Sequence, residues 1–137
     1  GANVEIREHV GAENFFIFGL KTEEVEARRA KGISGADAIK ASPWLGEVLD
    51  AIASGVFSPD DPGRYSQLVD VLRHHDHYML TADFDSYYST QRHVDEVWTT
   101  PSKWWEMSIL NTAKMGWFSS DRTIAEYARD IWKAETR

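Results

Sequence analysis

Cysteine is absent from this chain of 137 residues, which excludes disulfides, thiolate metal ligands and thiol nucleophiles. No apolar run approaches the length of a membrane span, and no basic leader precedes an apolar stretch. Basic residues are in deficit, with 15 Lys and Arg against 22 Asp and Glu and a formal net charge of −7. Such a surface repels nucleic acid on average. The sequence therefore predicts a soluble, cytoplasmic protein that binds neither nucleic acid nor membrane.

Several catalytic motifs are also missing. The sequence has no GxGxxG and no GxxxxGK[ST] phosphate loop. Ser119 and Ser120 lack the strand and sharp turn that surround a hydrolase nucleophile. Nothing assembles a nucleophile, a base and an oxyanion site. We therefore predict no catalytic, no cofactor-binding and no metal residue in this chain.

The composition is that of a folded protein. Hydrophobic residues make up 42% and charged residues 27%, which excludes wholesale disorder. The length suits one domain. The chain begins Gly1-Ala2-Asn3 without an initiator Met, which suggests an excised piece or a tag scar. Six Trp residues, many in the last third, indicate core or interface packing.

Capping residues and apolar periodicity predict a mostly helical chain. N-terminal signals are Asn3, Thr22 with Glu23 and Glu24, Ser42 before Pro43, Pro101, and Ser119 to Asp121, and glycines at 11, 32, 55 and 116 are the stops. The expected helices are Val4–Val10, Glu23–Ala30, Ser34–Ala41, Pro43–Ser54, Phe84–Trp98, Pro101–Met115 and a final helix reaching Trp132. A strand over Val4–Ile6 is the alternative to the first of them. A further helix carries Tyr65, Leu68, Val69 and Leu72 on one face, and the helix Phe84–Trp98 has an apolar stripe of Tyr87, Tyr88, Val94 and Val97.

Two segments depart from this helical pattern. Ser58–Gly63 consists of turn-forming residues throughout, and it is where we expect a mobile loop. Phe15–Phe18 is a run of four large apolar residues between turn formers, which predicts a buried strand. One strand cannot form a sheet. The neighbours of this strand are then either strands within the sequence that its pattern does not reveal or strands outside it, and the second reading indicates an incomplete chain.

The densest group of ligand-type residues is the run Arg73–His77. His74, His75 and His77, with Asp76, offer imidazole and carboxylate groups that suit zinc or a similar ion. No second segment must converge on them, so the favoured reading is a polar helix end, where His interacts well with the last carbonyls.

Acidic pairs raise the possibility of the two carboxylates of a glycoside hydrolase. Their local context favours caps, turns and solvated faces instead. The pairs are Glu23 with Glu24, Asp60 with Asp61, and Asp83 with Asp85.

Trp104 and Trp105 are adjacent in an expected helix. Neighbouring helical residues point about 100° apart, so both rings are not expected to enter one core. Either ring could face a sugar, although packing against another domain is the favoured reading.

The final helix joins a strict start signal to a distinctive sequence. Ser119, Ser120 and Asp121 are residue types that accept hydrogen bonds from first-turn amides. Arg122 is expected to pair locally. An apolar stripe then follows at three- and four-residue steps, which predicts a helix that seeks a partner surface; it consists of Ile124, Tyr127, Ala128, Ile131 and Trp132.

The string FSSDRTIAEYARDIW resembles the end of the glycogen and maltodextrin phosphorylases. Other stretches resemble that family in the same order, so the similarity covers essentially residues 1–137. They are Gly1 to Glu5, Glu13 to Gly19, Ser54-Gly55 with Phe57-Ser58, His74 to Asp76, Ala82-Asp83, and Ile109 to Ala113.

The resemblance implies a parent α-1,4-glucan phosphorylase, a glycosyltransferase that cleaves glycogen or maltodextrin with phosphate and releases glucose 1-phosphate. Such enzymes are homodimers that hold pyridoxal phosphate on a lysine in a motif reading approximately EASGTGNMK, upstream of the segment that resembles Gly1 to Glu5. No lysine here lies in such a motif, so no cofactor is expected on this chain. Its lysines are Lys21, Lys31, Lys40, Lys103, Lys114 and Lys133.

The resemblance also implies a fold class. The C-terminal half of these enzymes is a Rossmann-like α/β domain, and residues 1–137 would form its end, mostly α-helical with one or two short strands. The last helices would pack toward the missing N-terminal half. Differences from the animal enzymes at Lys21–Pro43 and Thr99–Trp105 suggest a bacterial enzyme.

Two hypotheses therefore stand, beside the alternative of a metal site at His74, His75 and His77. The first is a C-terminal phosphorylase fragment, structural and inactive alone, whose partner is the rest of the parent polypeptide. The second is an autonomous helical module that binds sugar or a partner through exposed Trp residues.

Overall fold

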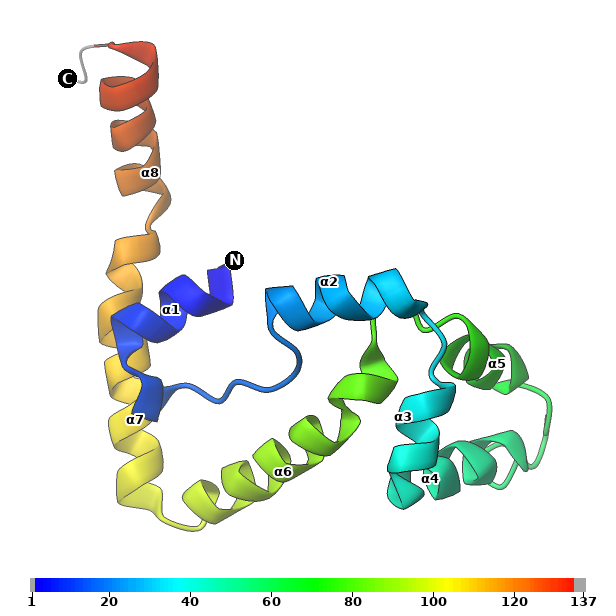
Figure 1. The fold of residues 1–137 in the computed structure, drawn as a ribbon. Coiled ribbons are helices and arrows are strands. Elements are labelled where there is room, and N and C mark those ends of the chain that lie inside the picture. Colours follow the sequence, from blue (N-terminus) through cyan, green and yellow to red (C-terminus); the bar gives the residue numbers. More distant parts are fainter. Residues whose placement is uncertain (1, 135–137) are drawn as a thin grey trace. The chain divides into compact units, whose positions relative to one another are not determined.

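The computed structural model describes residues 2–134. These residues form two compact units, the first containing residues 2–17 and 93–134 and the second residues 18–92. The sequence predicts one domain, whereas each unit has buried residues of its own. All the regular elements within the described range are helices, as Figure 1 shows. The prediction of a mostly helical chain is therefore confirmed.

Unit 1 carries the first and last helices of the chain. Its elements are α1 (Ala2–Val10), the short 3₁₀ helix η1 (Ala12–Asn14), the end of α6 (Leu80–Trp98), α7 (Pro101–Lys114), η2 (Met115–Phe118), α8 (Ser120–Glu126) and the π-helical η3 (Tyr127–Trp132). Unit 2 contains α2 (Thr22–Lys31), α3 (Ala36–Ala41), α4 (Pro43–Ala53), α5 (Ser66–His74) and the beginning of α6.

Predicted caps start several helices where expected. The Ser42 hydroxyl accepts from the Leu45 amide at 3.4 Å, and Pro43 occupies the first turn of α4, where its missing N–H costs nothing. Pro101 opens α7 in the same way. The Ser119 hydroxyl accepts from the Arg122 amide at 3.2 Å and starts α8. These three starts are confirmed.

Two predicted caps are displaced. Asn3 lies inside α1, which begins at Ala2, and the alternative strand over residues 4–6 is wrong because these residues are helical. Thr22 is the first helical residue of α2 rather than its cap. The Glu24 carboxylate instead accepts from the Lys21 backbone amide at 2.8 Å, so Lys21 takes the cap position.

α6 begins at Leu80, four residues before the predicted start at Phe84. Asp76 is responsible: its buried carboxylate accepts from the backbone amides of Leu80 and Thr81 at 3.0 and 2.8 Å. These amides belong to the first turn, where no intrahelical acceptor exists. The predicted apolar stripe of this helix is less buried than expected, because Tyr87 and Tyr88 are exposed.

The predicted strand at Phe15–Phe18 does not form, and no strand is present within residues 2–134. Phe15 is extended at φ −140° and ψ 122°, but no neighbouring strand pairs with it. Ile17 and Phe18 are 45% and 46% exposed, so the expectation of burial is also wrong for this end of the run. Local sequence favours an extended backbone here, yet a strand is stable only beside another.

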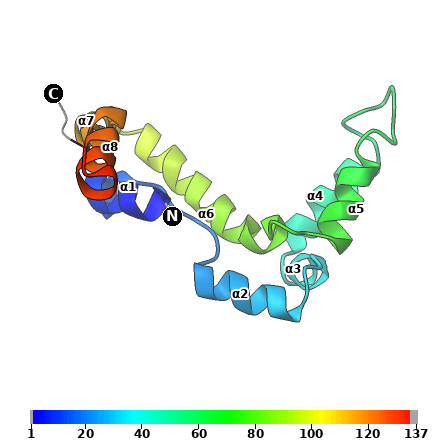
Figure 2. The same cartoon turned by 90° about the horizontal axis from the view of Figure 1, so that it is seen from above.

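Unit 2 has a small core between α3, α4, α5 and the start of α6; both views show α3, α4 and α5 side by side (Figures 1 and 2). Leu45, Leu49 and Val69 are its buried members, and Ile39, Ile52, Leu72 and Phe84 pack against them. Gly35 permits the close approach of α3 to α5, because a Cβ atom there would lie 2.2 Å from the Leu72 carbonyl oxygen. Leu68, placed on the same face by the sequence, is exposed.

The segment Ser58–Gly63 forms turns, as predicted. Successive backbone bonds join the Ser58 amide to the Gly55 oxygen at 2.9 Å and the Asp61 amide to the Ser58 oxygen at 3.0 Å. Gly55 has φ +77°, which a residue with a side chain adopts only with strain. It therefore turns the chain after α4.

Unit 1 is built on α7, which α1 and η1 contact. Val10 is completely buried, and Met107 on α7 is nearly so. α8 packs on its neighbours in the chain, η2 and η3, and only Ala128 is buried within η3. Within the part of the chain that the structure describes, no helix is both long and apolar enough to cross a bilayer.

Candidate functional site

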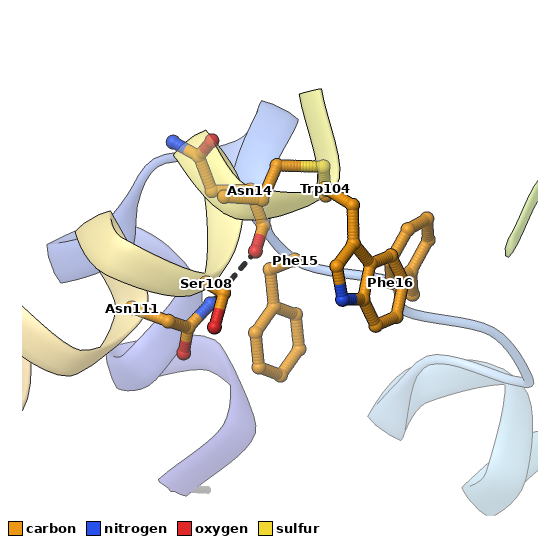
Figure 3. A pocket seen from close by; sticks show the side chains of 7 residues that line it. Asn14, Phe15, Phe16, Trp104, Ser108 and Asn111 are labelled. Carbon is orange, nitrogen blue, oxygen red and sulfur yellow. Dashed lines mark hydrogen bonds between the residues drawn. The ribbon is translucent and has the colours of Figure 1, made fainter. Parts of the chain in front are cut away.

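Unit 1 contains a concave pocket with a volume of about 370 Å³ (Figure 3). Its walls come from α7 on one side and from the segment following α1 on the other. The lining residues are Asn14, Phe15, Phe16, Trp104, Met107, Ser108 and Asn111. We call this the aromatic pocket.

Helical spacing places three of the lining residues on one stripe of α7. Trp104, Ser108 and Asn111 occupy positions i, i+4 and i+7, which lie on the same helix face. The Asn111 side-chain amide donates to the Asn14 carbonyl oxygen at 2.8 Å, drawn as a dashed line in Figure 3. This bond ties the two walls of the pocket together.

Aromatic contacts fix the other end of the pocket. The rings of Phe16 and Trp104 are stacked, with centroids 6.5 Å apart and planes at 25°. The Trp98 ring meets Trp104 edge to face at 4.9 Å, and the His93 ring meets Phe16 at 5.6 Å. Trp104 is therefore held by rings on more than one side, which makes it a rigid wall.

The two adjacent Trp residues of α7 have different environments, as predicted. Trp104 is half-buried in the aromatic cluster, whereas Trp105 is 64% exposed. The turn of about 100° between neighbouring helical residues is the cause. Trp104 is thus the member of the pair that faces the pocket.

The aromatic pocket contains residues that the sequence did not single out as a site. Phe15, Met107, Ser108 and Asn111 were not among the candidate residues, although Trp104 was. The signal that could have found them is the recurrence of Trp104, Ser108 and Asn111 on one helical face. Their convergence on Phe15 could not be read from that spacing, because it depends on tertiary packing.

The histidine run ends α5, as the favoured reading predicts. His74 is the last residue of α5 and lies 3.8 Å from the Asp70 carboxylate, while His77 packs edge to face on Tyr78. Among the described residues, no three His, Asp or Glu side chains are grouped so that they could hold a metal ion. Asp76, the carboxylate of that run, is committed to capping α6.

The acidic pairs are divided among separate structural contacts. The Asp83 carboxylate accepts from the Leu20 amide at 2.9 Å, and Asp85 accepts from the Ser42 hydroxyl at 2.6 Å. Asp60 pairs with Arg64 at 2.5 Å. Glu24, bound to the backbone amide of Lys21, and Asp60 make the local contacts that the sequence favours, whereas Asp83 and Asp85 bind residues far away in the sequence.

The lysines lie outside the aromatic pocket. A Schiff-base lysine needs a pocket that holds the cofactor beside its amine, and none of the six lysines lines the aromatic pocket. Lys103 pairs with Glu106 at 3.4 Å, and the Lys114 ammonium donates to the Val10 carbonyl at 3.5 Å. Lys21, Lys31, Lys40 and Lys133 are exposed.

The C-terminal helices present an apolar surface. Ile124, Tyr127, Ile131 and Trp132 are all exposed on α8 and η3, and we call them the C-terminal apolar face. Arg122 pairs locally, as expected: its guanidinium lies 2.5 Å from the Glu126 carboxylate, donates to the Trp117 carbonyl and stands 3.9 Å above the Trp117 ring.

Arg129 and Asp130 form an exposed ion pair on η3. The Arg129 guanidinium donates two hydrogen bonds to the Asp130 carboxylate, at 2.7 and 2.8 Å, and these bonds lower the pKa of Asp130. The same side-chain hydrogen bond raises the pKa of Arg129. Exposed pairs of this kind add little to stability.

Comparison with known proteins decides the family. The sequence profile of the carbohydrate phosphorylases matches residues 1–134. The chain belongs to the carbohydrate phosphorylase family. It is similar to a glycogen phosphorylase of Haemophilus influenzae, with 50% identity, to the brain form of glycogen phosphorylase of Homo sapiens, with 46%, and to the muscle form of Bos taurus, with 44%.

Each of these alignments covers 135 residues, or 98% of this chain. The chain spans only 16% of the length of each of these relatives. The predicted resemblance is therefore confirmed, and it is a resemblance to one short part of a phosphorylase.

Proposed function

We propose that this chain is the C-terminal portion of an α-1,4-glucan phosphorylase and has a structural role there. The parent enzyme is a cytoplasmic, homodimeric glycosyltransferase of bacterial origin. It cleaves glycogen or maltodextrin with phosphate to give glucose 1-phosphate, with pyridoxal phosphate bound outside this chain. The chain forms the end of the Rossmann-like α/β domain, and it is inactive alone. Family membership and the 16% coverage of the relatives support this proposal.

The observation that carries the proposal is the exposure of apolar side chains. Two separate compact units of half this mass would together expose about 8,700 Å². The chain exposes 10252 Å². The large hydrophobic residues at its surface include Trp44, Val48, Phe57, Leu68 and Val71 in unit 2 and Trp105, Ile109, Ile131 and Trp132 in unit 1.

Large apolar side chains exposed in this number are typical of an interaction surface. Covering it would provide the hydrophobic stabilisation that the small cores do not supply. The rest of a phosphorylase polypeptide is the partner that family membership favours, because the relatives carry it in the same chain. The predicted strand at Phe15–Phe18 supports the same partner, since Phe15 is extended without a neighbouring strand among the described residues.

An activity assay tests the inactivity of the chain. Purified chain is incubated with glycogen or maltoheptaose, phosphate and pyridoxal phosphate, and glucose 1-phosphate is measured. We expect no product, because none of the six lysines lies in the motif that holds the cofactor in the family and none lines the aromatic pocket. Turnover above that of a heat-denatured sample would overturn the structural role.

A binding assay tests the proposed partner. The Haemophilus influenzae relative, truncated to lack the segment matching this chain, is mixed with the purified chain, and complex formation is followed by co-purification. We expect a complex that Ile131→Glu weakens, because a charge would enter the covered apolar surface. Lys133→Glu is the matched control at a neighbouring exposed, charged position. Equal effects of the two changes would count against coverage of this face.

The exposure of five Trp side chains favours a second candidate function, an autonomous module that binds sugar or a partner through them. These residues are Trp44, Trp98, Trp105, Trp117 and Trp132. Titration with maltoheptaose, followed by tryptophan fluorescence, tests whether the chain alone binds a sugar. A saturable change in fluorescence that Trp105→Phe abolishes supports the sugar-binding module. If the fluorescence does not change, the hypothesis of sugar binding has no support.

A further inference from the structure

The helix α2 contributes no side chain to the core of unit 2. None of its residues is buried, and only Val25 and Arg28 are half-buried. A short helix that is polar on all sides gains little from burial and depends on contacts between surface groups. The surface of α2 therefore differs from the apolar surfaces that the rest of a phosphorylase is proposed to cover.

The exposed side of α2 carries acidic residues first, then small residues, then basic residues. We call it the α2 outer face; it consists of Glu23, Glu26, Ala27, Ala30 and Lys31, with Arg29 at its edge. The first four of these residues occupy positions i, i+3, i+4 and i+7, which lie on one side of a helix. All six side chains are exposed.

The charged groups of the α2 outer face are unpaired within residues 2–134. No ion pair and no side-chain hydrogen bond to another described residue is made by Glu23, Glu26, Arg29 or Lys31. The helix dipole favours this order of charges, with acids at the first turn and bases at the last. It explains the order but leaves every group without a partner. A partner of one charge sign would be attracted to one half of the face and repelled by the other.

A second copy of α2 has the complementary order of charges when it runs antiparallel to the first. Each residue advances a helix by about 1.5 Å, so a two-fold axis at Ala27 places Glu23 level with Lys31 of the partner subunit. Glu26 then lies within about 1.5 Å, measured along the helix, of the level of Arg29 of the partner subunit. We propose that the α2 outer face is a self-complementary contact between two copies of this chain.

Other occupants fit this face less well. The rest of a phosphorylase polypeptide is favoured at apolar surfaces, whereas the α2 outer face has no apolar side chain larger than that of Ala27 or Ala30. An anionic polymer is repelled by Glu23 and Glu26. A second copy satisfies both halves of the face, and two-fold symmetry forms each ion pair twice.

The contact is weak and depends on salt. The net charge of −7 opposes the meeting of two copies, exposed ion pairs contribute little each, and association has a large entropic cost. We therefore expect dimers only at protein concentrations on the order of 1 mM. Salt at about 0.5 M screens exposed charges and should abolish the contact. Association through apolar surfaces is not weakened by salt in this way.

Translational diffusion of the full chain, measured by NMR at rising protein concentration, tests the proposal. We expect diffusion to slow with concentration in about 50 mM sodium chloride but not in about 500 mM. Arg29→Glu with Lys31→Glu makes the face acidic. Glu23→Lys with Glu26→Lys makes it basic. Each double variant should weaken self-association at least about tenfold, because attractions become like-charge repulsions. Both variants leave the cores intact, since α2 has no buried residue.

A mixture of the two double variants brings an acidic face to a basic one, so association should return in the mixture. Arg7→Glu with Lys40→Glu is the matched control, because both residues are exposed outside α2 and the change in net charge equals that of the acidic variant. It should keep the association that the acidic variant loses.

Three results would overturn the proposal. They are absence of association of the unchanged chain, association that persists in about 500 mM salt, and a mixture that diffuses as its separate components do. An equal loss in the control and in the acidic variant would also overturn it. None of these results bears on the proposed phosphorylase role, which complex formation with the truncated relative tests separately.

Discussion

The Asp76 carboxylate accepts hydrogen bonds from both the backbone amide and the side-chain hydroxyl of Thr81, at 2.8 and 2.6 Å. Both residues are buried, with Asp76 only 4% exposed. The third bond, from the Leu80 amide, completes a cap on the first turn of α6. A negative charge at a helix N-terminus also interacts favourably with the helix dipole.

Replacing this carboxylate should destabilise unit 2. Asp76→Ala leaves the Leu80 and Thr81 amides and the Thr81 hydroxyl unpaired, and loss of a cap costs up to about 2 kcal/mol. Unpairing the buried hydroxyl adds about 1 kcal/mol. We expect the free energy of unfolding, measured by urea denaturation, to fall by about 2–3 kcal/mol. Asp70→Ala is the control: this exposed residue lies 3.8 Å from His74, and its loss should change the value by less than about 0.5 kcal/mol. Equal losses would contradict the capping role.

Asp76 also shows where sequence reading reached its limit. Its neighbours His74, His75 and His77 suggest a metal site in the sequence. The apolar pattern of the next helix begins only at Phe84, so the sequence gives no reason to expect a helix cap at Asp76. Met79 has φ +58°, a left-handed conformation. This turn of the backbone lets Asp76, four residues before Leu80, reach the first turn of α6. Propensity gives no sign of such a conformation at Met.

Other helix starts were readable because their signals are local. Ser42 with Pro43, Pro101 and Ser119 act within three residues of the positions that they cap. The run at Phe15–Phe18 behaves differently, because its strand depends on partners far away in the sequence or outside it. The aromatic pocket belongs to the same class, since Asn14 and Asn111 meet only through the packing of α7.

A methyl group at Gly35 should disrupt the contact of α3 with α5. The Cβ atom would lie 2.2 Å from the Leu72 carbonyl oxygen and 2.9 Å from the Thr81 methyl carbon, so backbone must move. We expect Gly35→Ala to lower the free energy of unfolding by about 1–3 kcal/mol, the usual cost of overpacking.

Gly46 provides the matched control for this glycine. It lies inside α4, and the nearest atom to its added Cβ would be 3.9 Å away. Gly46→Ala should therefore raise the free energy of unfolding by about 0.5–1 kcal/mol through helix propensity. If both alanine variants shift the urea midpoint in the same direction, the close approach at Gly35 is not what limits α3.

Neighbouring serines at the start of α8 should respond differently to alanine. The Ser119 hydroxyl accepts from the Arg122 amide at 3.2 Å, so Ser119→Ala should destabilise the helix by about 1 kcal/mol. Ser120 is the first helical residue, and Ser120→Ala should leave α8 unchanged or slightly more stable. Amide hydrogen exchange at Arg122 and Thr123 measures the local effect. Faster exchange in Ser120→Ala than in Ser119→Ala would contradict the assignment of the cap.

Truncation of a residue on the C-terminal apolar face should have a small effect in the chain alone and a large effect in the complex with the rest of a phosphorylase. Ile131 is 64% exposed, so Ile131→Ala should change the stability of this chain by less than about 0.5 kcal/mol. Once another part of a phosphorylase covers the face, the same truncation creates a cavity and should cost about 2–5 kcal/mol. The second value is obtained as the loss of affinity for the truncated relative. Leu49→Ala is the reference, because Leu49 is 2% exposed in the core of unit 2 and its truncation should cost about 2–5 kcal/mol in the chain alone. A face that stays uncovered predicts no loss of affinity with Ile131→Ala, so the measurement decides whether these apolar residues are an interface.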